Sequence, residues 1–191
     1  MSLTPVKSGR ARALDAALSV LREHGFAAVT MRSVAEAAGM TAPALYWHYQ
    51  DKDALLRDVY REVTAVHRHH VYSALGTGNA VERLRAALEA LRTFAVAEPN
   101  LYEVLYLAPP PAGAPRSTNT MLHLVDELVR NCMRENALED ADPSDVALTV
   151  SAHAHGTVQQ FRRGQFDSEA AFAAFHRRSF DRLLAGIARD G

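Results

Sequence analysis

Helical periodicity runs through nearly all of this 191-residue chain and restricts its fold more than any other feature. Apolar residues recur at intervals of three and four, and no stretch alternates apolar and polar residues as a half-buried β-strand does. The sequence also has no runs of β-branched residues, which favour strands. It therefore predicts an all-α fold.

Capping residues divide this pattern into about nine helices. The first is expected over residues 9–24, before Gly25, and a short second helix over residues 31–38, before Gly39. Thr41 can cap a third helix, and Asp51 opens a long fourth helix that should run to about Ala74. Further helices are expected from Val81 to Pro99, over Asn100–Ala108, around Met121–Cys132, and over residues 143–163 and 168–189. The segment Pro109–Pro115 is predicted to be a loop, since proline lacks the N–H that a helix interior needs.

Residues 30–56 carry the most specific signal. Thr30 and Thr41 can cap two very short helices, and Gly39-Met40-Thr41 joins them with the spacing of a helix-turn-helix. Small apolar residues are placed to pack between the two helices: Val34, Ala35, Ala38 and Leu45. This segment is therefore predicted to be a DNA-binding motif.

The second short helix has Tyr46, Trp47 and His48 beside small residues. A helix of this length cannot bury so many rings on one face, so some must point outward. Small side chains allow close approach to base edges, while ring heteroatoms reach phosphates or bases, which suits a DNA major groove. Lys52 opposes the dipole of the next helix, and a bound phosphate would give both the lysine and the helix amides a partner.

The run Thr30–Thr41, followed by Ala44–Tyr49, Lys52 and Leu55-Leu56, resembles the signature of the TetR family of transcriptional regulators, with a tetracycline-repressor-like helix-turn-helix. The resemblance covers residues 10–60. By position it implies the following DNA contacts: Thr30, Arg32, Thr41, Ala42, Pro43, Ala44, Tyr46, Trp47, His48 and Lys52. The alternatives are that Tyr46 and Trp47 belong to the core and that Arg32 is a solvated charge. Tyr49 is expected to pack against the first helix.

The resemblance also implies an architecture and a function. Residues 1–56 would form a three-helix DNA-binding head, with a connecting helix from residue 51, and residues 57–191 an effector-binding and dimerisation body. The protein would be a repressor that a small molecule releases from double-stranded operator DNA. It would be a homodimer through residues 143–163 and 168–189. Composition points the same way, because these segments hold more apolar surface than one small body should need: Ala147, Val150, Ala154, Val158, Phe172, Phe175 and Phe180.

Seven residues are predicted to line an effector pocket, because the family arrangement would bring their four helices together: Phe94, Leu101, Leu105, Met121, Val125, His153 and Thr157. Only His153 and Thr157 have polar side chains, so the expected effector is a mostly apolar small molecule held by shape. The alternative is that these side chains simply fill the core.

A histidine cluster, His67, His69 and His70, stands near the end of the long helix. His67 and His70 are one turn apart, but no Cys, Asp or Glu follows in the nearby sequence to complete a metal site. Cations near a helix C-terminus are stabilising without a ligand. No metal and no cofactor are therefore predicted, and the role of the cluster is left open.

The sequence gives little evidence that the protein is an enzyme. It has no Walker loop, no G-x-S-x-G and no G-x-G-x-x-G, and Cys132 lies on an apolar stripe as a core thiol would. A helical-bundle enzyme or a partner protein that does not bind DNA stays as an alternative. The single cysteine and the lack of a signal region or of an apolar span long enough for a membrane favour a soluble cytoplasmic protein, while the net charge of −1 does not by itself indicate nucleic-acid binding.

Overall fold

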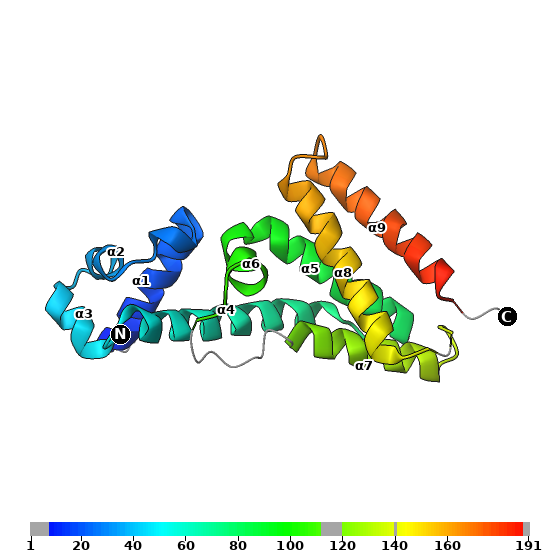
Figure 1. The fold of residues 1–191 in the computed structure, drawn as a ribbon, viewed down its shortest axis with the longest axis horizontal. Helices are drawn as coiled ribbons and strands as arrows, with labels where there is room; N and C mark the ends of the chain where they lie inside the picture. Colours follow the sequence, from blue (N-terminus) through cyan, green and yellow to red (C-terminus); the bar gives the residue numbers. More distant parts are fainter. Residues whose placement is uncertain (1–7, 112–119, 140, 189–191) are drawn as a thin grey trace, which may run out of the picture. The chain divides into compact units, whose positions relative to one another are not determined.

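The computed structural model describes residues 8–111, 120–139 and 141–188. These residues form nine α-helices, one short 3-10 helix and no regular strand, which confirms the all-α prediction (Figure 1). They cluster into two compact units: unit 1, within Met1–Val66 and Glu98–Arg116, and unit 2, within His67–Ala97 and Ser117–Gly191.

Unit 1 is built around α1 (Gly9–His24), which packs against α2, α3 and α6. Ser8 caps α1 by accepting a hydrogen bond from the Ala11 amide, and Gly25 ends it at φ 81°, a conformation that favours glycine. The remaining elements of unit 1 are η1 (Phe26–Ala28), α2 (Met31–Ala37), α3 (Ala42–His48), the first part of α4 (Lys52–Ala74) and α6 (Pro99–Tyr106).

Contacts with α1 hold α6 in unit 1. Arg22 of α1 forms an ion pair of 3.2 Å with Glu98, which precedes α6, and the Asn100 amide donates to the Arg22 carbonyl at 2.8 Å. Pro99 begins the helix, where its missing N–H costs nothing. Helix α6 is thus attached to the same unit as the helix-turn-helix.

Unit 2 contains the rest of α4 together with α5 (Ala80–Ala97), α7 (Thr120–Arg134), α8 (Pro143–Arg162) and α9 (Glu169–Gly186). Helix α5 packs against α7, α8 and α9, and α8 packs against α7 and α9. Helices α8 and α9 form an antiparallel pair (Figure 1). Asp142 caps α8 and Ser168 caps α9, as the predicted starts of these helices require.

The predicted helices agree with the structure except at their ends. Helix α9 stops at Gly186 rather than running to residue 189, because the chain after it pairs with the segment that precedes α8: Leu138 forms a bridge with Ala188, and the Glu139 amide donates to the Ile187 carbonyl at 3.0 Å. Residues 112–115 of the predicted proline-rich loop lie outside the described residues.

The apolar residues of α8 and α9 were expected to leave apolar surface exposed for a dimer partner, but they do not. Six of the seven are at most 3% exposed within a single chain, and Phe175 is half-buried. They pack inside unit 2 instead, for example Phe161 on Phe172 with ring centroids 4.5 Å apart. The compositional argument for dimerisation is therefore wrong. None of the helices in the described part of the chain is both long and apolar enough to cross a membrane.

Candidate nucleic-acid interface

Helices α2 and α3 form a helix-turn-helix whose ends are fixed by side-chain caps. The Thr30 hydroxyl accepts from the Ser33 amide at 3.1 Å, and the Ser33 hydroxyl accepts from the Thr30 amide at 3.0 Å, which is a capping box. Gly39 turns the chain at φ 62°, and Thr41 then caps α3 by accepting from the Ala44 amide. Thr30 and Thr41, both predicted to contact DNA, therefore also fix where α2 and α3 begin.

Helix α3 has one buried and one exposed face. Leu45 is fully buried, while Tyr46 is 51% and Trp47 83% exposed, the latter the most exposed large apolar side chain among the described residues. His48 is half-buried and meets the Trp47 ring edge-on at 5.0 Å. The small residues of the predicted contacts are exposed as well: Ala42, Pro43 and Ala44.

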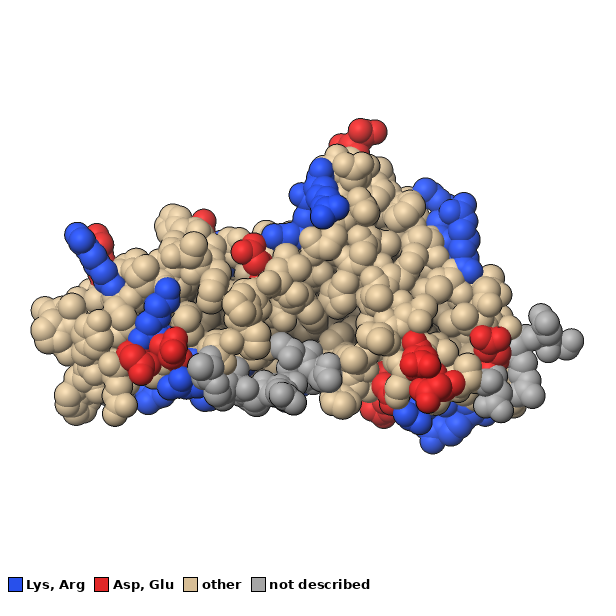
Figure 2. Space-filling view, in the orientation of Figure 1, with Lys and Arg blue, Asp and Glu red and all other residues tan. Residues whose placement is uncertain are grey.

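The exposed face of α3 is uncharged. No residue of Ala42–His48 is Lys, Arg, Asp or Glu, and the surface over α3 is tan in Figure 2, whereas acidic and basic side chains are interspersed over the rest of the visible face. Arg32 on α2 and Lys52 at the start of α4 are exposed, and neither forms an ion pair with a described residue. The motif therefore offers a ring-bearing surface flanked by two available cations.

A polar network with a buried centre and exposed arginines, which the sequence did not predict, joins α1, the end of α3 and α4. Asp58, only 7% exposed, accepts from Arg10 at 2.7 and 3.1 Å and from the Tyr49 hydroxyl at 3.2 Å, and pairs with Arg61 at 2.8 Å. Burial alone would raise the pKa of Asp58, but the Arg10 hydrogen bonds and the charges of Arg10 and Arg61 lower it overall. The Arg10 guanidinium also lies 4.8 Å from the centre of the Tyr49 ring, so Tyr49 packs against the first helix as predicted.

Replacing Asp58 by alanine is expected to lower the free energy of unfolding by about 1–3 kcal/mol, because the buried Tyr49 hydroxyl would lose its acceptor. Urea denaturation followed by circular dichroism measures the effect. Glu62→Ala, at an exposed position one turn further along α4, is the matched control and should leave the midpoint unchanged. Equal midpoints for the two variants would show that the network does not stabilise the head.

The seven predicted effector residues are divided between the units. Leu101 and Leu105 are buried in unit 1, and the others belong to unit 2, where Phe94, Met121, Val125 and Thr157 are buried and His153 is half-buried. The two polar members already have partners on α9: His153 bonds with Ser179 at 3.0 Å and Thr157 with His176 at 2.8 Å. None of the seven lines either of the two cavities that the structure describes.

The histidine cluster is placed around Phe94 in unit 2. The rings of His67 and His70 lie 4.6 and 5.6 Å from the Phe94 ring, and His70 bonds with the Thr93 hydroxyl at 2.9 Å. Burial, together with the nearby His70 and His155, lowers the pKa of His67 to about 4. His69 is exposed. Within the described residues, no group of three His, Cys, Asp or Glu side chains could hold a metal ion.

Comparison with known proteins identifies the family. Residues 13–59 match the bacterial regulatory proteins of the TetR family, and residues 84–187 match the tetracyclin repressor-like C-terminal domain. The second match alone covers more than half of the chain, so the chain belongs to the TetR family of bacterial regulatory proteins.

Curated tetracycline repressors are similar in sequence to part of this chain. The tetracycline repressor protein class D of Escherichia coli is 41% identical over 71 residues, which are 37% of this chain and 32% of the repressor. The chain thus matches about a third of the length of the first curated relatives.

Solved structures share the fold over almost the whole chain. A Rhodococcus sp. RHA1 protein of unknown function has a TM-score of 0.83 at 23% identity, covering 99% of this chain and 100% of that one. The Bacillus subtilis transcriptional regulator FadR, in complex with stearoyl-CoA, has a TM-score of 0.72 at 16% identity, covering 93% and 98%.

Proposed function

We propose that this protein is a ligand-responsive, DNA-binding transcriptional regulator, a repressor that a small molecule releases from its operator. The observation that supports this most strongly is the exposed, uncharged ring surface of α3 on a capped helix-turn-helix. An 83% exposed tryptophan is costly in water, and DNA bases would cover it. No catalytic role is proposed for any residue. Operator binding would place the protein in the cytoplasm.

In this proposal α3 enters the major groove. Tyr46, Trp47 and His48 contact base edges or nearby phosphates, while Ala42 and Ala44 let the backbone approach and contact thymine methyl groups. Pro43 shapes the first turn of α3, where Thr41 is placed for the same groove. Arg32, Lys52 and Thr30 contact the phosphate backbone, which fixes the position of the head without reading sequence.

Lys52→Ala is expected to weaken binding to all duplexes about equally and to lower the salt dependence of the association constant by about one unit on a double-logarithmic plot, as the loss of one phosphate contact does. Fluorescence anisotropy with labelled duplexes at several salt concentrations measures this. Arg68→Ala removes an exposed cation of α4 in unit 2 and should leave the slope unchanged. If Lys52→Ala leaves the salt dependence unchanged, Lys52 does not contact a phosphate.

Dimerisation is proposed through α8 and α9, over residues 143–163 and 168–189, as the family resemblance implies. Leu148 supports this, because it is 57% exposed, and the exposed residues Ala152 and Gly156 follow it at intervals of four along α8. Two copies of such a stripe can approach closely and cover the leucine. A symmetric dimer would read a near-palindromic operator with half-sites about one turn apart, roughly 34–36 Å.

Leu148→Glu is expected to convert the dimer to a monomer, because it places a charge in the proposed interface. Light scattering at micromolar concentration measures the mass. Leu107→Glu changes a leucine of similar exposure (46%) in unit 1 and is the matched control. A monomer for the unmodified protein, or a dimer for Leu148→Glu, would contradict this interface. Ala154, one of the apolar residues that composition assigned to the interface, cannot be used for this test. It is fully buried within one chain, so a charge there would unfold unit 2 whether or not a dimer forms.

The effector is proposed to be a mostly apolar small molecule bound by the body. Phe94, Leu101, Leu105, Met121 and Val125 are the apolar candidates for its contacts, with His153 and Thr157 as polar ones. Effector binding could reach the helix-turn-helix through α6, which is attached to α1 by the Arg22–Glu98 ion pair and by the hydrogen bond from Asn100 to Arg22. An effector that shifts α6 would therefore also displace α1. Linkage then requires operator and effector to weaken each other's binding by the same factor.

Selection of duplexes from a random library by the full-length protein tests the proposal. The expected result is enrichment of one near-palindromic sequence, with a dissociation constant of about 10⁻⁸ M or below and at least about 10³-fold preference over random DNA. Retention of DNA without enrichment of any sequence, or no retention at moderate salt, would overturn it.

A further inference from the structure

The start of α1 and the end of α3 pack against each other through a glycine. A side chain at Gly9 would collide with His48: its Cβ atom would lie 2.8 Å from Cε1 and 3.1 Å from Cδ2 of the imidazole, and closer still to Nε2. Ordinary contacts of a Cβ atom begin at about 3.4 Å. The His48 ring therefore lies directly on the backbone of α1, in space that only glycine leaves open.

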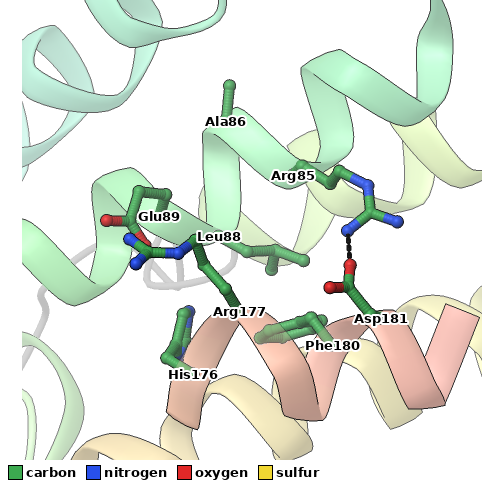
Figure 3. A pocket seen from close by; sticks show the side chains of 8 residues that line it. All are labelled: Arg85, Ala86, Leu88, Glu89, His176, Arg177, Phe180 and Asp181. Atoms are coloured by element: carbon green, nitrogen blue, oxygen red, sulfur yellow. Dashed lines mark hydrogen bonds and ion pairs between the residues drawn. The ribbon is translucent and has the colours of Figure 1, made fainter. Parts of the chain in front are cut away.

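This contact differs from the one between α5 and α9 in unit 2. There, long side chains span the space between the helices, and Arg85 of α5 pairs with Asp181 of α9 across a cavity of about 370 Å³ (Figure 3). At Gly9 the ring of His48 meets the backbone directly, with no side chain between them. Any larger residue at position 9 would displace the ring itself rather than fill a gap.

The backbone conformation of Gly9 does not itself require glycine. Its φ angle lies outside the left-handed region, in contrast to those of Gly25 and Gly39. Gly9 is the first residue of α1, directly after the Ser8 cap, and alanine is the better helix former. The close approach of His48 is thus the feature of the structure that calls for a glycine at this position.

His48 connects Gly9 with the exposed face of α3. Its half-buried ring meets the Trp47 ring edge-on at 5.0 Å, and Trp47 is 83% exposed. The His48 ring makes no hydrogen bond or ion pair with a described residue, so its packing between Gly9 and Trp47 sets its direction. A residue on α1 thereby influences how two of the proposed DNA contacts are presented.

We propose that Gly9 is a positioning residue for sequence reading by α3, a role that rests on the proposed function. The missing side chain lets the His48 ring lie on α1, and the ring in turn limits the directions open to Trp47. Both rings then meet the major groove already in one arrangement, which reduces the cost of ordering them on binding. Base contacts carry the specificity, so displacing the rings affects operator more than random DNA.

Tryptophan emission of the protein without DNA tests the contact itself. Gly9→Ala should alter the emission of Trp47, the only tryptophan, because the His48 ring beside it moves. In a His48→Ala background the same change should leave the emission unaltered, since no ring is displaced.

Gly78→Ala is the matched control for the emission measurement. Gly78 also lies outside the left-handed region, and a Cβ atom there would collide with one side chain, that of Glu82 in unit 2. Its replacement should leave the emission of Trp47 unaltered. An emission that Gly9→Ala does not change would overturn the proposal, whether or not the protein binds DNA.

A double-mutant cycle on operator binding tests the role in sequence reading. Gly9→Ala should weaken binding to the selected operator at least about fivefold, as the loss of one base contact does, and binding to random duplexes much less. In the His48→Ala background it should change the operator affinity less than about twofold, because the group through which Gly9 acts is gone. Fluorescence anisotropy measures the four affinities, with Gly78→Ala expected to bind as the unmodified protein does.

The outcomes separate this role from a general effect on the fold. Equal losses for Gly9→Ala in the two backgrounds would show that the residue acts on α1 alone and would overturn the proposal. Thermal melts of Gly9→Ala should show a melting temperature no lower than that of the unmodified protein, since alanine favours the helix. Selection of no operator by the unmodified protein would instead overturn the proposed function, and the emission would still show whether Gly9 holds His48.

Discussion

Replacing Tyr46 and Trp47 together by alanine is expected to weaken binding to the selected operator by about 100-fold or more. A good contact with a base edge contributes about 1–3 kcal/mol of discrimination, and two such contacts would be lost. Binding to random duplexes should fall much less, because non-specific affinity comes mainly from phosphate contacts, which are proposed for Arg32 and Lys52 and which the double variant keeps. Competition gel shifts with operator and random DNA measure both affinities.

Folding should not account for this loss. Tyr46 and Trp47 are 51% and 83% exposed, so their removal should leave the midpoint of urea denaturation nearly unchanged. Tyr72→Ala is the matched control, since Tyr72 is also 51% exposed but belongs to α4 in unit 2. Equal losses on operator and random DNA for the double variant would show that α3 does not read sequence.

Acidification from pH 7.5 to pH 5 is expected to lower the free energy of unfolding by about 2 kcal/mol for each buried neutral histidine. Burial lowers the pKa of His67 and of His176 to about 4, although Glu89 and the Leu88 backbone act to raise the latter. In the unfolded chain these pKa values return to about 6.5, so only the unfolded state gains protons at pH 5. Their contribution to stability is thus complete above about pH 6.5 and is lost as the pH falls toward 4.

Urea denaturation at the two pH values measures this loss. His176→Gln is expected to reduce the pH dependence, whatever its own stability, because it removes one of the titrating groups. His69→Gln changes an exposed histidine of the same protein and should leave the pH dependence as it is. Free energies of unfolding that agree at pH 7.5 and pH 5 would contradict the burial of neutral histidines in unit 2.

Local signals predicted the helix starts and the exposed face of α3. The caps Thr30, Thr41 and Asp142 act within three residues of sequence, so their presence determines where α2, α3 and α8 begin. The outward direction of Tyr46 and Trp47 also followed from sequence, because seven residues offer only one buried face. Short-range rules of this kind need no knowledge of the tertiary structure.

Features that depend on distant partners were not predictable. Asp58 is one of three carboxylates on α4, and nothing in the sequence shows that Arg10 and Tyr49 meet it from other parts of the chain. The apolar side chains of α8 resembled an interface, but α5, α7 and α9 of the same chain cover them. The end of α9 likewise depends on Leu138, which lies almost fifty residues earlier in the chain. Composition and periodicity show that a face is apolar without showing which element covers it.

Trp47 permits the most direct measurement of the central claim, that the exposed face of α3 contacts operator DNA. It is the only tryptophan of the chain and is 83% exposed, so all tryptophan emission comes from this face. Titrating the protein with its selected operator should shift or quench this emission, with a midpoint equal to that of the gel shift. Emission that stays constant while the same samples show full retardation of the operator would contradict the claim, since DNA would then bind elsewhere.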